Sequence, residues 1–242
     1  MMTSKSIGFS RTVYLSWLDA TAMCRAQTDD LGQIRQELEP ILEKHLTGKV
    51  ARRKTIDVLL SIWHKSADVS PILHKDAISL YQNAYVSSDY VWLHYGLTLI
   101  YYPLFRQVTS AIGQISRFEE TITRDMLKRR MASEFGHLGA LDRYVERLSA
   151  SLTEWGILPA AEARSVYRPI RRELITDSLE LQLWLLACAL FAHPGESLPF
   201  TDFLRLPELF PFKFSVALED FRSSDYFSVQ REGMGWDMVR LL

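Results

Sequence analysis

Apolar side chains recur every three or four residues along most of this sequence, which is the spacing of one face of an α-helix. In the first part of the chain the pattern predicts helices over residues 12–27, 31–46, 50–64, 71–81 and 90–102. The last of these is apolar on nearly every side and is expected at the centre of a bundle, whereas Pro40 is expected to kink or split the second. We therefore expect residues 1–102 to form an N-terminal helical bundle.

Residues 103–173 follow a different plan. Helices are expected over 104–118 and 123–135, with Thr123 as the cap of the second. After a turn with two glycines, a third helix runs to Gly156, a typical stop residue. The apolar stripe of this third helix is unusually regular and consists of Leu138, Leu141, Val145, Leu148, Leu152 and Trp155.

A short strand–loop–strand is expected over Ile157–Arg168. Helices, a tight turn, a further helix and a β-ribbon form the order of a winged helix-turn-helix, in which the helix after the turn lies in the major groove of DNA. Residues 103–173 are therefore expected to be a winged helix-turn-helix unit.

Residues 174–242 repeat this order of elements, although not its residues. Thr176 and Asp177 are expected to cap the first helix, and Gly233–Gly235 supplies the turn of a terminal β-hairpin. This part is acidic, with eight acids and four bases over 196–237. The expected fold class is mostly α, an N-terminal helical bundle followed by two winged-helix-like units with short β-hairpins, the central one basic and the last one acidic.

Composition narrows the class of protein further. The chain has 242 residues, 48% of them hydrophobic, and a formal net charge of −1, which excludes intrinsic disorder. The sequence has two cysteines, Cys24 and Cys188, which are far apart in the chain. Disulfide-stabilised secreted domains are rich in cysteine, so this usage is typical of a protein from a reducing compartment. No apolar core of a signal peptide precedes Gly8, and the longest apolar runs fall short of the ~20 residues that cross a bilayer. We expect a cytoplasmic protein without membrane contact.

Positive charge is concentrated in a few segments, which point to an anionic partner. The candidates for contact with DNA phosphates are Lys128, Arg129, Arg130, Arg164 and Arg168. The candidates for contact with base edges are His137, Arg143, Tyr144 and Arg147. A secondary basic patch, at a helix start where cations oppose the helix dipole, comprises Lys49, Arg52, Arg53 and Lys54. The alternative for the central unit is that its cations pair with Glu134, Asp142 and Glu146 on a helix surface.

The sequence carries no catalytic signature. It has no phosphate-binding glycine loop, no spaced Cys/His metal motif and no nucleophile elbow. The six histidines are scattered, and His94 is expected to be a hydrogen-bonded core histidine. We expect no enzyme activity, no cofactor and no metal.

Two segments carry a resemblance to a known family. They are Trp-Leu-His-Tyr-Gly…Tyr-Pro-Leu-Phe-Arg at 92–106 and Ser-Leu-Thr-Glu-Trp-Gly-Ile-Leu at 151–158. Together with the tandem helical layout they resemble the BrxA family, small helical accessory proteins of prokaryotic BREX phage-defence systems. The resemblance implies winged-helix-like units and association with DNA.

The functional expectation is a non-catalytic accessory protein that binds double-stranded DNA within a larger assembly. One alternative is an adaptor subunit that touches protein partners only, through an exposed apolar patch around Phe210 and Phe212. Another is a homodimeric repressor, since dimers read half-sites one helical turn apart.

Overall fold

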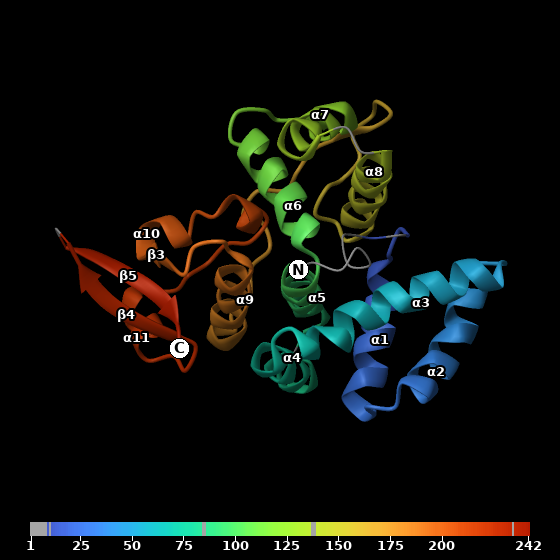
Figure 1. Cartoon of the computed structure of the whole chain (residues 1–242), viewed down its shortest axis with the longest axis horizontal. Helices are drawn as coiled ribbons and strands as arrows, with labels where there is room; N and C mark the ends of the chain where they lie inside the picture. The colour runs from blue at the N-terminus through green and yellow to red at the C-terminus, as the bar shows by residue number, and fades with distance from the viewer. Residues whose placement is uncertain (1–8, 10, 84–85, 137–138, 234) are drawn as a thin grey trace.

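The computed structural model describes residues 9, 11–83, 86–136, 139–233 and 235–242. Over this part of the chain the fold is mostly helical and contains two small antiparallel sheets (Figure 1). The expectation of a mostly α protein is therefore confirmed. Within the described ranges no helix has both the length and the apolar character needed to cross a bilayer.

The first part of the chain is a group of helices in which α1, α3 and α4 pack against α5, near the middle of Figure 1, and α2 packs against α1 and α3. Its elements are α1 (Leu15–Gln27), α2 (Leu31–Glu43), α3 (Lys49–Trp63), η1 (Lys65–Asp68), α4 (Pro71–Asn83), η2 (Ser87–Asp89) and α5 (Tyr90–Tyr101). Every residue of α5 from Val91 to Ile100 is buried, as its all-round apolar pattern predicts. The predicted split of the second helix is wrong: α2 continues through Pro40, which stands in the last turn and removes a single donor.

The next elements form the central unit, which runs from α6 to β2. They are α6 (Pro103–Ser116), β1 (Ile122–Thr123), α7 (Arg124–Phe135), α8 (Gly139–Glu154) and β2 (Val166–Tyr167). The predicted cap of α7 is confirmed, because the hydroxyl of Thr123 accepts a hydrogen bond of 3.1 Å from the backbone N–H of Met126. Gly156 has φ +72°, the left-handed conformation in which glycine ends helices.

The predicted strand–loop–strand over Ile157–Arg168 is confirmed in part, because the backbone N–H of Arg168 donates to the carbonyl of Pro159 at 2.9 Å and that of Ala161 to the carbonyl of Val166 at 2.8 Å. An antiparallel bridge joins Ala160 to Tyr167, and β2 also pairs antiparallel with β1, but residues 157–158 themselves do not pair with 165–168. The backbone N–H groups of Ile157 and Leu158 both donate to the carbonyl of Leu152, at 3.0 Å each. They close the end of α8 and are therefore not available to a ladder.

The last part is the C-terminal unit, from α9 to β5. Its elements are α9 (Leu179–Ala192), β3 (Ser197–Pro199), α10 (Phe200–Phe203), η3 (Pro207–Leu209), α11 (Leu218–Arg222), β4 (Phe227–Glu232) and β5 (Trp236–Leu241). The strands lie in the order β3-β5-β4, and the expected hairpin is β4–β5. The cap of α9 is Ser178, which accepts from the backbone N–H of Leu181, and not the predicted Thr176 and Asp177.

The central and C-terminal units share a topology. In each, a short strand follows the first helix and pairs antiparallel with the last strand: β1 with β2, and β3 with β5. The sequence predicts a repeated order of elements, and the structure adds that the strand pairing is repeated as well.

Two glycines allow the C-terminal unit to lie against the rest of the molecule. A Cβ on Gly96 of α5 would lie 2.5 Å from the ring of Trp184 of α9, and a Cβ on Gly113 of α6 would overlap the backbone of Pro207 in η3. Both helix contacts therefore require the absence of a side chain.

The expected apolar surface patch around Phe210 and Phe212 is also wrong. Phe212 is 1% exposed, and its ring packs 4.5 Å from that of Trp92 and 4.9 Å from that of Tyr95. It is needed to cover the apolar helix α5, while Phe210 is half-buried.

His94 of α5 is a core histidine, as expected, and is fully hydrogen-bonded. Nε1–H of Trp63 donates to its Nδ1 at 2.9 Å, so its Nε2 carries the proton and donates to Asp19 at 2.8 Å. Burial lowers the pKa of His94, and it also lowers the pKa values of His64 and His74.

Because these pKa values are lowered, the unfolded chain binds protons that the folded protein does not. The free energy of unfolding is expected to fall as pH drops below about 6.5, by up to about 1.4 kcal/mol per pH unit for each histidine that stays neutral in the fold. Urea unfolding between pH 7.5 and 5.5 measures this. His94→Gln keeps an acceptor and a donor without a titrating proton, so its loss of stability should be less steep. An equally steep loss would contradict the role given to His94.

Candidate nucleic-acid interface

Helix α8 has one buried and one exposed face, as the sequence predicts. Its apolar stripe is buried at Leu141, Val145, Leu148 and Leu152, and Trp155 just after the helix is buried as well; Leu138 lies outside the described residues. The opposite face exposes Asp142, Arg143, Glu146 and Arg147. Among the described residues, Arg143 and Arg147 form no ion pair, so two free guanidinium groups stand one turn apart on this face.

Tyr144 does not belong to this exposed face, which corrects the sequence-based assignment. It is 5% exposed, because position 144 falls on the same side of the helix as Leu141 and Leu148. Its ring lies edge-on to that of Phe9, and burial raises the pKa of its hydroxyl, which has no hydrogen-bond partner among the described residues. A side chain held in this position cannot reach a base edge.

The three consecutive cations of α7 point in different directions, since neighbouring residues on a helix are about 100° apart. Arg130 turns toward α6, where it donates to Gln114 at 2.9 Å, and its Nε pairs with Glu134 at 3.1 Å. The predicted alternative of a local carboxylate pair therefore holds for Arg130. Arg129 is exposed, and Lys128, one turn after Arg124, is half-buried.

Arg124 connects the elements of the candidate interface. Its Nη1 pairs with Glu146 of α8 at 3.3 Å, and its Nη2 donates to the hydroxyl of Tyr167 in β2 at 3.0 Å. One side chain thus brings the start of α7, the exposed face of α8 and β2 together. Sequence reasoning missed Arg124; its signal is a cation in the first turn of a helix, where the dipole disfavours it.

The remaining candidates flank β2. Arg164 and Arg168 are exposed and form no ion pair within the described ranges. Ser165 between them has φ +61°, and its carbonyl accepts from the backbone N–H of Arg124 at 2.9 Å, which holds the loop against α7. His137 lies outside the described residues.

One of the four residues predicted for the secondary basic patch is buried. Arg52 is 4% exposed, and its Nε donates to Glu39 at 2.5 Å while its Nη1 donates to the carbonyls of Leu46 and Thr47. It holds the loop between α2 and α3 and is no free surface cation. The other three members, Lys49, Arg53 and Lys54, are exposed.

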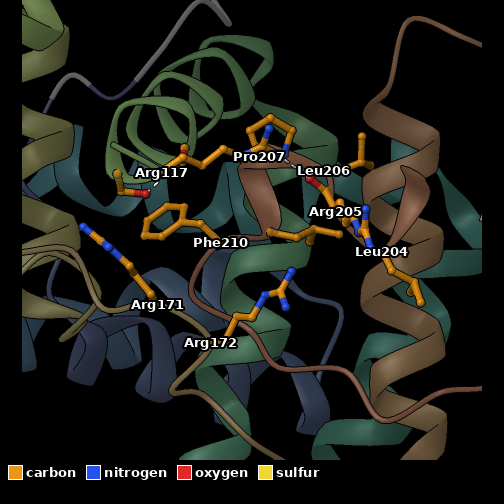
Figure 2. Close-up of a pocket in the computed structure, with 11 residues that line it drawn as sticks. Arg117, Arg171, Arg172, Leu204, Arg205, Leu206, Pro207 and Phe210 are labelled. Carbon is orange, nitrogen blue, oxygen red and sulfur yellow. Dashed lines mark hydrogen bonds between the residues drawn. The ribbon is translucent and has the colours of Figure 1, made fainter. Parts of the chain in front are cut away.

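A second basic site lies where α6, the link after β2 and η3 meet. Arg117, Arg171, Arg172 and Arg205 line a pocket of about 290 Å³ there (Figure 2). The sequence shows Arg171 and Arg172 only as the end of a basic run, and nothing local predicts that Arg117 and Arg205, which are far apart in the chain, join them.

Comparison of the chain with protein-family models, with curated proteins and with solved structures finds no match in any of the three. Among the described residues, no group of three His, Cys, Asp or Glu side chains is placed to hold a metal ion. The geometry and charge of the molecule single out two basic sites, the exposed face of α8 beside β2 and the arginine-lined pocket.

Proposed function

We propose that the central unit is a winged helix-turn-helix and that the protein binds double-stranded DNA through it as a non-catalytic accessory protein. In this proposal α8 enters the major groove, and the loop before β2 contacts the sugar–phosphate backbone. The wider setting, a phage-defence assembly, is proposed on the sequence resemblance alone.

The observation that carries the proposal is the exposed pair Arg143 and Arg147 on α8, held beside β2 by the bonds of Arg124. An arginine without a carboxylate partner can form two parallel hydrogen bonds to guanine or to a phosphate. The pairing of β1 with β2 supports the same arrangement, because it places Arg164 and Arg168 next to the helix pair.

The charges also set the expected strength of binding. Asp142 and Glu146 share the exposed face of α8 with the two arginines, and Arg130 is partly neutralised by Glu134. We therefore propose Arg129, Lys128, Arg164 and Arg168 as the phosphate contacts, and we expect affinity that falls steeply with salt.

The test compares two double variants by fluorescence anisotropy with a labelled duplex. Arg143→Ala with Arg147→Ala is expected to lower affinity about 10- to 100-fold and to leave the slope of log K against log salt largely unchanged, because that slope is set by the phosphate contacts. The matched control, Lys44→Ala with Lys75→Ala, removes two exposed cations of the N-terminal helices and should change little. Equal loss in both variants, or no duplex binding by the parent protein at low salt, would contradict the proposal.

A further inference from the structure

The second basic site is larger than the pocket of Figure 2. A second hollow of about 530 Å³ adjoins it and shares Arg172, Leu204 and Arg205 with it. We call the two hollows together the arginine trough. The cations that line it are Arg117, Arg171, Arg172, Arg205 and Lys213.

The positive charge of the trough is not neutralised by neighbouring carboxylates. No carboxylate is among the residues that line either hollow, and none of the five cations forms an ion pair within the described part of the chain. Glu173, which follows Arg172 in the chain, accepts with its carboxylate from the backbone N–H of Arg171 at 3.4 Å. A concave site lined by one sign of charge concentrates its field on an incoming anion.

Two of the guanidinium groups are held in place by neutral acceptors. Arg117 donates to the carbonyl of Arg205 at 2.8 Å, and Arg171 donates to the carbonyl of Glu119 at 2.6 Å. These bonds fix the direction of each side chain and leave its charge and its other N–H groups available. Such preorganised donors are what a phosphate group requires.

The backbone at Arg172 is strained, and this conformation accompanies the placement of two neighbouring arginines in one pocket. Its φ is +55°, a conformation that costs energy for any residue other than glycine. The strained link is held by hydrogen bonds from the N–H of Arg172 to Phe210 and from those of Glu173 and Leu174 to Pro211. As a result Arg171 and Arg172, although neighbours in sequence, both line the same pocket (Figure 2).

Aromatic rings line the same two hollows as the cations. Phe210 lines the first hollow, where Figure 2 shows it among the arginines, and Phe200 and Phe214 line the second. All three are half-buried, and Phe214 stands edge-on to Trp92 of α5 with ring centroids 5.7 Å apart. The rings are therefore anchored in the core and present part of their surface to the trough.

We propose that the arginine trough binds a short single strand of nucleic acid, with phosphates on the arginines and bases against the phenylalanine rings. Arginine grooves with interleaved aromatic rings bind single strands because every base has a stackable face. In a duplex the bases are stacked on one another, so the rings would gain no partner. Two adjoining hollows with five cations also exceed what one mononucleotide can fill. This proposal is independent of duplex binding by α8.

The experiment uses the full chain and a labelled oligothymidylate of about 12 nucleotides. The trough variant combines Arg172→Gly with Arg205→Ala. Glycine relieves the strained φ at 172, so the thermal midpoint should not fall, and at 205 the carbonyl that holds Arg117 remains. Loss of both guanidinium groups is expected to weaken single-strand binding about tenfold or more.

The control variant is Arg143→Ala with Arg147→Ala, which removes the same charge from α8. The trough variant should lose single-strand binding and keep duplex binding, while the α8 variant should do the reverse. Phe210→Leu keeps apolar volume without a ring and should weaken single-strand binding about tenfold, which charge alone does not predict.

Three results would overturn the proposal. They are unchanged single-strand affinity in the trough variant, binding of a mononucleotide as tight as that of the strand, and equally tight binding of polyglutamate. Failure of the duplex proposal would appear only in the duplex measurements on the α8 variant. It can therefore be distinguished from failure of the single-strand proposal.

Discussion

Gly113→Ala is expected to destabilise the protein by about 3 kcal/mol, at the upper end of the range for an overpacked site. The added methyl would overlap the carbonyl group of Pro207, which is backbone and cannot rotate away. The contact of α6 with η3 would have to open, and with it the floor of the arginine trough.

Chemical unfolding of the variant and of the parent protein measures the effect. Gly139→Ala is the matched control, because a Cβ at Gly139 meets nothing within 4 Å and alanine is the better helix former. It should be neutral or slightly stabilising. A Gly113→Ala protein as stable as the control would mean that α6 and η3 are not packed as described.

Arg106→Ala is expected to cost about 3–5 kcal/mol, because it leaves a buried carboxylate without its counter-ion. Arg106 donates from Nε to Glu208 at 2.8 Å, and Glu208 is 1% exposed. Glu208 also fixes η3 to α5, because its backbone carbonyl accepts a hydrogen bond from the hydroxyl of Tyr95.

A double variant separates the ion pair from its burial. Arg106→Met with Glu208→Leu removes both charges and keeps apolar volume, so it should be less destabilised than Arg106→Ala alone. Equilibrium unfolding of Arg106→Met, of Glu208→Leu and of the double variant gives the coupling energy. Additive losses would show that the two side chains do not depend on each other.

Local patterns predicted the helices well. The stripe of α8, the cap at Thr123 and the fully apolar α5 follow from spacing and side-chain chemistry within one or two turns. Strand pairing was predicted in part: the hairpin β4–β5 and the pairing of 159–161 with 166–168 were expected, and the pairing of β1 with β2 was not. Residues 157–158 have a strand-like sequence, but their N–H groups close α8, and β1 pairs with β2 from over forty residues away.

The candidate site was predicted in part. Arg143 and Arg147 are exposed, as their helical phase requires, but the same phase buries Tyr144, which was suggested as a base contact by its place early in the helix. Arg52 is bound to Glu39, a partner that charge counting along the chain does not locate, whereas Arg130 pairs with Glu134, one of the carboxylates that the sequence offers as an alternative partner. The arginine trough joins residues from α6, the link after β2 and the α10–η3 turn, and such a long-range cluster leaves no periodic trace in the sequence.

The burial of α5 has a consequence for how this protein is made and dissected. Its apolar surface is complete by residue 101, but Trp184 and Phe212, which cover part of it, come more than eighty residues later. During synthesis that surface leaves the ribosome long before its cover, a condition that favours aggregation of the nascent chain. Truncation at residue 102 would make the same exposure permanent, so single-residue substitutions in the intact chain are the sound route to its function.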